Sequence, residues 1–139
     1  MNYLLDTNVL SELRRPRQAD RRVLDWFAAR DSLSTFISAI TIAELEYGAA
    51  LAAYRQKPHA LLLRSWIDDL ILPGFAGRIV PVDEAVAIRY AHFQVPESRF
   101  FADVMIGATA QVHGLTVVTR NTADFARFAV PMINPWSTP

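Results

Sequence analysis

Short apolar runs alternate along the chain with longer segments in which apolar residues recur every three or four positions. The runs are typical of buried strands, and the longer segments predict helices with one apolar face. The predicted strands are residues 2–5, 33–38, 79–82, 115–119 and, as a last edge strand, 131–135. We therefore expect an α/β fold, a three-layer α/β/α domain whose central, mainly parallel sheet has about five strands.

Residues that favour helix ends mark the boundaries of the predicted helices. Asp, Ser and Thr are typical first residues, Gly commonly follows the last turn, and Pro interrupts a helix. The predicted helices run from Asp6 to Pro16, from Asp20 onward, from Thr41 to Pro58, over residues 59–71 up to Pro73-Gly74, from Asp83 onward, and over residues 101–113 up to Gly114.

Length and composition fit one domain. The chain has 139 residues, and 52% of them are hydrophobic, which suffices for a core without disulfides. No internal repeat, low-complexity tract or linker-like change in composition divides the chain. We expect residues 1–139 to form a single domain.

Composition also excludes several kinds of site. There is no cysteine, which rules out disulfides, thiolate zinc sites and cysteine nucleophiles. His59, His92 and His113 are too far apart in sequence to form a helical zinc-binding pair. No apolar run approaches the roughly 20 residues that span a bilayer, and the first residues lack the pattern of a signal peptide. We expect a soluble cytoplasmic protein without membrane contact.

The charges balance, with fourteen cationic and fourteen acidic side chains. A zero net charge argues against a broad phosphate-binding surface but leaves room for a narrow catalytic groove. All but one of the cations are arginine, and five arginines crowd residues 14–22. This cluster is either a solvated surface or a contact for phosphate or a partner.

Four acidic residues lie near predicted strand ends or helix starts. Asp6 follows the first strand directly, Glu44 lies one turn into the helix after the second, and Asp124 lies shortly after the fourth. Ligands bind beyond the carboxyl ends of parallel strands, so we expect these acids on one edge of the sheet. Asp103 can join them from the start of a neighbouring helix.

Each of these acids also has a simpler interpretation. Asp6 can cap a helix, Glu44 can be a surface residue, Asp103 can favour the helix dipole, and Asp124 can form a turn. As a set they imply more, because clustered carboxylates repel one another and a divalent cation removes that repulsion. Mg²⁺ prefers such oxygens and can activate water toward phosphorus, alone or as a metal pair. The set therefore predicts metal-dependent phosphodiester hydrolysis.

The local sequences around these acids resemble those of a known family. Residues 4–12, 38–48, 102–110 and 113–125 are similar to the four motifs of PIN-domain ribonuclease toxins of the VapC and FitB type, which belong to type II toxin–antitoxin systems. Residues 77–83 and 134–136 also resemble FitB-type chains. The resemblance runs nearly end to end, in the order and spacing of the family.

This resemblance implies a PIN-like domain that acts as a Mg²⁺- or Mn²⁺-dependent endoribonuclease on RNA. It implies that Asp6, Glu44 and Asp103 are the core catalytic and metal-binding acids. It adds Asp124 as a fourth acid, and it places three supporting polar residues beside the site, namely Asn8, Thr119 and Asn121. Because Asn121 stands where some relatives carry Asp, either Asp124 supplies the fourth acid or the site relies mainly on three.

The resemblance also implies protein partners. It predicts a homodimer and a cognate antitoxin, with which the chain forms a hetero-oligomer on operator DNA. An arginine of the antitoxin that pairs with the acids is a natural inhibitor, because it replaces the charge of the cation. The sequence adds that residues 40–57 and 59–71 carry apolar residues all around, which favours self-association through this helix pair.

Two other functions remain at this stage. An Asp after the first strand is also the nucleophile of haloacid-dehalogenase-type phosphatases, but those need a second Asp two residues later, where this chain has Asn8. A PIN fold that only docks partners is the other, and the intact acidic set argues against it. The segment between Ala91 and Asp103 looks shorter than in relatives, which affects the lip of the groove and the choice of substrate.

Overall fold

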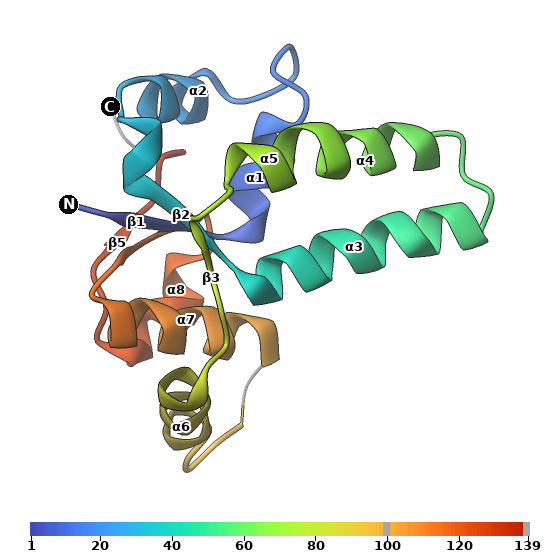
Figure 1. The fold of residues 1–139 in the computed structure, drawn as a ribbon. Coiled ribbons are helices and arrows are strands. Elements are labelled where there is room, and N and C mark those ends of the chain that lie inside the picture. Colours follow the sequence, from blue (N-terminus) through green and yellow to red (C-terminus); the bar gives the residue numbers. More distant parts are fainter. Residues whose placement is uncertain (99–100, 138–139) are drawn as a thin grey trace.

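A computed structural model describes residues 1–98 and 101–137 and contains a five-stranded sheet in the order β3-β2-β1-β4-β5 (Figure 1). Every neighbouring pair of strands is parallel. The strands are β1 (Tyr3–Leu5), β2 (Thr35–Ser38), β3 (Ile79–Val80), β4 (Thr116–Val118) and β5 (Met132–Ile133). The predicted α/β fold and its parallel sheet are confirmed, and β5 is an edge strand as expected.

Helices cover both faces of the sheet (Figure 1). One face carries α1 (Thr7–Leu13) and α2 (Arg21–Ala28), and the other carries α6 (Glu84–Phe93), α7 (Phe101–His113), α8 (Thr122–Phe125) and the 3-10 turn η3 (Ala126–Phe128). Strand side chains alternate between the two layers, so Leu4 and Val117 pack into one core cluster and Leu5 and Val118 into the other.

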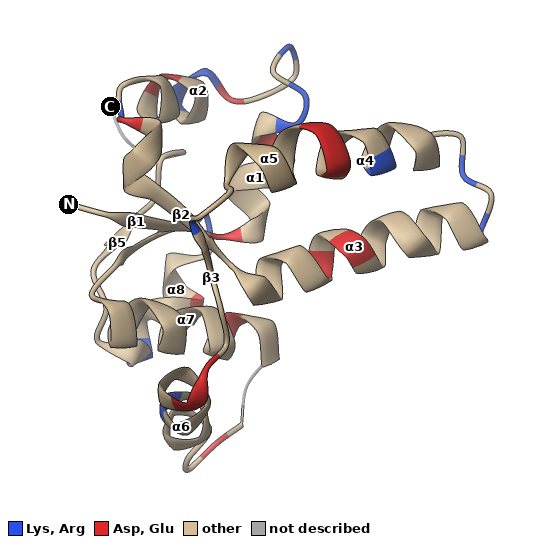
Figure 2. Cartoon of the chain, in the orientation of Figure 1, with Lys and Arg blue, Asp and Glu red and all other residues tan. Residues whose placement is uncertain are grey.

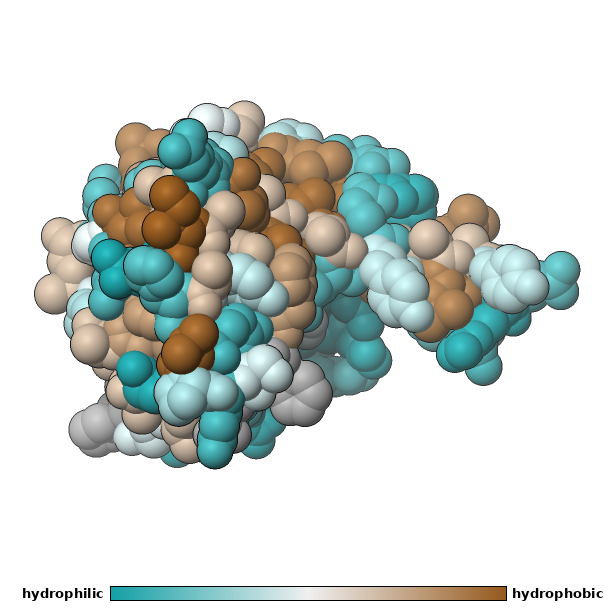
Figure 3. Space-filling view, turned by 90° about the horizontal axis from the view of Figure 1, so that it is seen from below, coloured by the Kyte–Doolittle hydropathy of each residue, from teal (hydrophilic) through white to brown (hydrophobic). Residues whose placement is uncertain are grey.

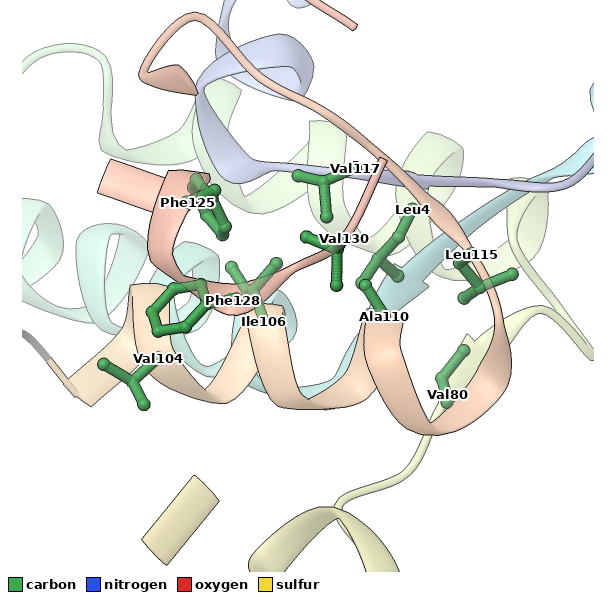
Figure 4. Close-up of a cluster of buried hydrophobic side chains, with 10 residues drawn as sticks. All are labelled: Leu4, Val80, Val104, Ile106, Ala110, Leu115, Val117, Phe125, Phe128 and Val130. Atoms are coloured by element: carbon green, nitrogen blue, oxygen red, sulfur yellow. The ribbon is translucent and has the colours of Figure 1, made fainter. Parts of the chain in front are cut away.

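The core on the α7 face is closed by phenylalanines from the end of the chain (Figure 4). Phe125 and Phe128 are buried, and their rings meet edge to face at a centroid distance of 5.9 Å. Phe128 also lies against Gly107 of α7, where an added Cβ would fall 2.4 Å from the Phe128 ring. Glycine at position 107 therefore allows η3 to approach the helix closely.

Two helices project beyond the sheet as an arm of residues 39–74 (Figure 1). The arm consists of α3 (Ala39–Tyr54), α4 (Ala60–Trp66), a π-helical turn η2 (Ile67–Ile71) and the short α5 (Leu72–Gly74). Arg64 of α4 joins the two helices with an ion pair to Glu46 of α3 at 2.7 Å, and it forms a second pair at 2.7 Å with Asp68, one turn further along its own helical segment. In Figure 3 the arm extends from the body, and hydrophobic residues stand among hydrophilic ones on it.

Several helix boundaries differ from those predicted. The helix expected from Thr41 begins at Ala39, because the Ser38 side chain accepts a hydrogen bond from the Ile40 N–H and caps it. That helix ends at Tyr54, four residues before Pro58. The next one continues past residue 71 to Gly74, since the π-helical turn shifts the hydrogen-bond register just before Pro73, which has no N–H to donate.

Other boundaries match the sequence. Asp20 and Asp83 cap α2 and α6 through their carboxylates, and Gly114 follows α7 with a φ of 65°. The strand predicted over residues 33–38 is shortened at its start by a 3-10 turn, η1 (Ser32–Ser34), which Asp31 caps. In the segment between Ala91 and Asp103, residues 94–98 are not helical, and residue 99 lies outside the described residues. Within the described ranges, no helix has the length and apolar character to cross a membrane.

Candidate active site

Asp6 stands where β1 leads into α1, in the middle of the sheet. Its N–H donates to the Val118 carbonyl at 2.9 Å, and its side chain caps α1 by accepting the Thr7 N–H at 2.7 Å. Asp6 is 4% exposed. The simpler interpretation of Asp6 as a helix cap is therefore correct, but the cap uses one carboxylate oxygen only, so a second role stays open to this residue.

The second oxygen of Asp6 gathers the polar residues that the sequence placed beside it. The Thr119 hydroxyl donates to Asp6 Oδ2 at 2.7 Å, and the Asn8 side-chain amide donates to the same oxygen at 3.3 Å. Thr119 in turn accepts the N–H of Asn121 at 3.0 Å. These donors hold the Asp6 carboxylate in one orientation. Burial raises its pKa above 3.8, and the hydrogen bonds from Thr119 and Thr7 oppose that rise.

Glu44 reaches the same region from α3. The Thr7 hydroxyl donates to Glu44 Oε1 at 2.6 Å and lies 3.3 Å from the hydroxyl of the buried Thr41. Burial raises the pKa of Glu44, and the nearby charge of Asp6 adds to the rise, against the hydrogen bond from Thr7. Glu44 is therefore an exposed residue, as the simpler interpretation has it, but its carboxylate is held by Thr7.

Asp103 lies in the first turn of α7, where the helix dipole favours a negative charge. Its pKa is nevertheless raised from 3.8 to about 6. Burial is the main cause, and the charges of the other three acids add to it, namely Asp6, Asp124 and Glu44. Asp103 is thus coupled electrostatically to each of the other three acids. Figure 2 shows the acidic segments of α3, α7 and α8 around the end of the sheet where β1 leads into α1.

Three of the four acids line one hollow of about 430 Å³, which we call the acidic hollow. Asp124 lies instead in an adjoining hollow of about 300 Å³, which shares Asp103 with the first. Asp6, Glu44 and Asp103 thus line one hollow, and Asp124 lines the adjoining hollow together with Asp103. The acidic hollow is lined by Asp6, Glu44, Asp103, Asn8 and Asn121, and also by Thr7, Ser11, Glu12, Arg120 and Trp136.

The chemistry of this hollow fits a hard divalent cation. Its acids offer carboxylate oxygens, which Mg²⁺ and Mn²⁺ prefer. The raised pKa values of Asp6, Glu44 and Asp103 show that the folded chain disfavours three negative charges here. Within residues 1–98 and 101–137, no three acidic or histidine side chains already converge as a ready metal-binding group.

Five residues that line the acidic hollow were not among the predicted site residues, namely Thr7, Ser11, Glu12, Arg120 and Trp136. Helical spacing could have indicated Thr7, Ser11 and Glu12. Positions 7 and 11 lie one turn apart on α1, and position 12 lies one turn after the predicted site residue Asn8. Glu12 accepts the N–H of Asp20 at 2.8 Å. Arg120 and Trp136 stack at 5.3 Å, a pairing across 16 positions that no local pattern indicates.

Comparison with known proteins places the chain in a family. The PIN domain model matches residues 3–131. The chain is 44% identical over 138 residues to Toxin FitB of Neisseria gonorrhoeae, covering 96% of this chain and 97% of that protein. It is 37% identical over 138 residues to VapC ribonuclease Y4jK of Sinorhizobium fredii, covering 96% of each.

Solved structures show the same fold. The structure of FitAB bound to an IR36 DNA fragment matches with a TM-score of 0.86 and 39% identity, over 99% of this chain and 97% of that one. A toxin–antitoxin complex from Klebsiella pneumoniae matches with a TM-score of 0.67 and 28% identity, over 99% and 100%. Together with the acidic hollow and the parallel sheet, these matches show that the chain belongs to the PIN domain family, in the group of the FitB and VapC toxins.

Proposed function

We propose that this protein is the toxin of a toxin–antitoxin pair and that it cuts RNA as a Mg²⁺- or Mn²⁺-dependent endoribonuclease. The observation that carries the proposal is the set of four acids, from the end of β1, α3, α7 and α8, whose charges meet around one edge of the sheet. The likeness to a VapC ribonuclease, at 37% identity over nearly the whole chain, supports RNA as the substrate.

In this proposal Asp6, Glu44 and Asp103 would hold the divalent cation, which would activate water and offset charge on the phosphate oxygens. Asp6 is oriented by Thr119 and Asn8, so one of its oxygens keeps a fixed position beside the hollow. Thr7 links the two carboxylates on either side of it, because its N–H donates to Asp6 and its hydroxyl to Glu44. Asp124 acts from the adjoining hollow as the fourth acid.

The arrangement around Asp6 does not favour a phosphatase that uses Asp6 as a covalent nucleophile. Such an enzyme needs a carboxylic acid two residues later as proton donor. At that position the Asn8 amide donates to Asp6 at 3.3 Å and cannot exchange a proton as an acid does. Trapping a phosphoryl or fluoroberyllate adduct on Asp6 would nevertheless overturn the nuclease proposal.

The same proposal includes an antitoxin and a homodimer. The solved relatives include FitAB on DNA and a toxin–antitoxin complex, which supports a cognate antitoxin and assembly of the pair on operator DNA. An antitoxin arginine entering the acidic hollow would stabilise the charged forms of the acids. Self-association through the arm is supported by large apolar side chains that stand exposed on it, namely Tyr47, Tyr54, Leu61, Leu62 and Leu70. A strictly monomeric mass at micromolar concentration would contradict this part.

The test is cleavage of RNA by the purified protein, free of antitoxin, with Mg²⁺ or Mn²⁺ and with a chelator. We expect cleavage that requires the metal and falls at least a hundredfold in Asp6→Asn and in Asp103→Asn, as expected when a metal-binding or electrostatic group is lost. Asparagine keeps the cap at position 6, so Asp6→Asn is expected to fold. Asp69→Asn, an exposed acid of the arm, is the matched control. Equal activity in Asp6→Asn and the wild type would point to a contaminating nuclease and contradict the proposal.

A further inference from the structure

Three hollows follow one another along α1, the helix that begins beside Asp6. The acidic hollow shares Ser11 and Glu12 with a second hollow of about 240 Å³, which Arg15 and Gln18 complete. The second shares Arg15 with a third hollow of about 420 Å³. We call the third the arginine hollow, and its lining residues are Arg14, Arg15, His59, Leu62 and Trp66. Because each hollow shares residues with the next, the three adjoin one another from the acids to the far end of α1.

The arginine hollow combines positive charge with an apolar wall. The Arg14 guanidinium lies 6.0 Å from the centre of the Trp66 ring. Arg15 is exposed and has no ion-pair partner among residues 1–98 and 101–137. Burial, and then the charge of Arg15, lower the pKa of Arg14. Among the residues that the structure describes, no acidic one lines this hollow. Two adjacent guanidinium groups without a carboxylate favour an anion, and phosphate matches their forked donors.

A nucleic acid that enters the acidic hollow needs such cations at some distance. The carboxylates repel every phosphate except the one beside the metal, so the remaining backbone charge must be offset elsewhere. Figure 2 shows a run of basic residues directly after α1. From Thr7 to Arg14 the helix rises about 10 Å, since each residue adds about 1.5 Å. That length equals about three nucleotide steps of about 3.4 Å in a stacked strand.

We propose that single-stranded RNA lies along α1 and places a nucleotide in the arginine hollow, about three steps from the phosphodiester that is cut. Arg14 and Arg15 bind its phosphate, and its base packs against the Trp66 and Leu62 side of the hollow. Aromatic surface beside a cationic track is the usual means of binding single strands without strict sequence readout. This inference rests on the proposed function, because it describes how the substrate of the same site continues beyond it.

The test uses a labelled single-stranded RNA of ten nucleotides, chosen from a random pool because the wild type cuts it, and versions shortened from either end. In Arg15→Ala we expect kcat/KM to fall about tenfold through KM, with kcat kept, as when a contact to unreacting substrate is lost. The slope of log affinity against log salt becomes smaller by about 0.7. Arg17→Ala is the control, because Arg17 is an exposed arginine of the same segment that lines none of the three hollows.

Shortening the RNA separates a bound nucleotide from a general charge effect. Removal of nucleotides from one end should lower kcat/KM of the wild type at least as much as Arg15→Ala does, because it also removes the contacts with Arg14 and Trp66. On the shortened RNA, Arg15→Ala should then cause little further loss, since the phosphate that Arg15 binds is already absent. Independent, additive losses, or an equal loss in Arg17→Ala, would overturn the proposed path.

Two further outcomes are informative. If Arg15→Ala cuts and binds RNA like the wild type but releases a co-expressed antitoxin, the arginine hollow is a protein-docking site and the RNA path is wrong. If the wild type neither binds nor cuts any RNA, the proposed function itself has failed and this inference with it. If the wild type cleaves RNA and Arg15→Ala cleaves it with the same kcat/KM, the proposed RNA path is wrong but the proposed function is not affected.

Discussion

The acidic edge of the sheet and the helical arm are held in place by different means. At the edge, Asp6 is 4% exposed, and three donors from the chain fix its carboxylate. In the arm, Arg64 is 40% exposed and ties α3 to α4 through one surface ion pair, with Glu46, and forms a second with Asp68 of its own helical segment, while Tyr54 is 87% exposed. Buried, fully hydrogen-bonded groups keep their geometry, whereas exposed ion pairs contribute little.

This difference shows how the fold divides its tasks. The proposed chemistry lies where the packing of the sheet fixes side-chain positions, and the arm leaves apolar side chains available to other molecules. Glu44 connects the two regions, because it lies near the base of the arm and is bound by Thr7 of the body. A disturbance of the body should therefore change both stability and the site, and a disturbance of the outer arm should change neither strongly.

The largest contrast is expected between two glycine-to-alanine substitutions. In Gly107→Ala the new Cβ meets the buried Phe128 ring at 2.4 Å, so we expect the free energy of unfolding to fall by about 1–3 kcal/mol. In Gly48→Ala, on α3 of the arm, the Cβ has no heavy atom within 4 Å, and the helix should gain about 0.5–1 kcal/mol. Urea unfolding of both variants measures this. Equal effects would show that Phe128 is free to move.

The next effect concerns the acids without metal. Because the pKa of Asp103 is raised from 3.8 to about 6, the folded state binds the proton more tightly than the unfolded state. Stability of the metal-free protein should therefore fall as pH rises from about 4 to about 6, and stay lowered above that. Asparagine cannot ionise, so Asp103→Asn should be more stable at neutral pH by on the order of 1 kcal/mol, after allowance for partial exposure.

Thermal unfolding in chelator at several pH values measures the effect of Asp103→Asn. The gain should vanish near pH 4, where the wild-type carboxyl is also neutral, and it should shrink when Mg²⁺ is added, because the wild type binds the metal more tightly. The exposed Asp69→Asn should show no gain of this kind. An Asp103→Asn protein that is less stable than the wild type throughout would contradict the electrostatic account.

The smallest effect is expected in the arm. Arg64→Met keeps the aliphatic stem and removes both ion pairs, so we expect a loss of about 0.5 kcal/mol that disappears at high salt. Arg21→Met breaks one more exposed pair, with Asp25, and should have almost no effect. Chemical unfolding at two salt concentrations compares them. A loss of several kcal/mol in Arg64→Met would mean that the arm is held by this network after all.

Much of the fold was accessible from the sequence, for identifiable reasons. β4 is β-branched and apolar, Asp20 and Asp83 are strong caps, and Gly114 adopts the left-handed conformation that glycine favours. The start of α3 was misplaced because Ser38 ends β2 and caps the helix at once. The π-helical turn before Pro73 has no signature in apolar spacing, so the end of that helix was placed too early.

The site was accessible only in part. Strand ends and family motifs indicated the four acids, since both depend on local sequence. The link from Thr7 to Glu44 spans 37 positions and depends on how α1 packs near α3, which no local pattern reports. The same holds for Asp124, because only tertiary packing decides that it faces the adjoining hollow. The sequence thus indicates which acidic residues are candidates for the site, whereas tertiary packing determines which hollow each side chain faces.

Binding of Mn²⁺ to the antitoxin-free protein, measured by calorimetry at neutral pH, is the most direct test of the central claim that the acids share one cation. We expect binding by the wild type and by Asp69→Asn, with affinity at least tenfold weaker in each of Asp6→Asn, Glu44→Gln and Asp103→Asn. Equal affinity in all five proteins would contradict it.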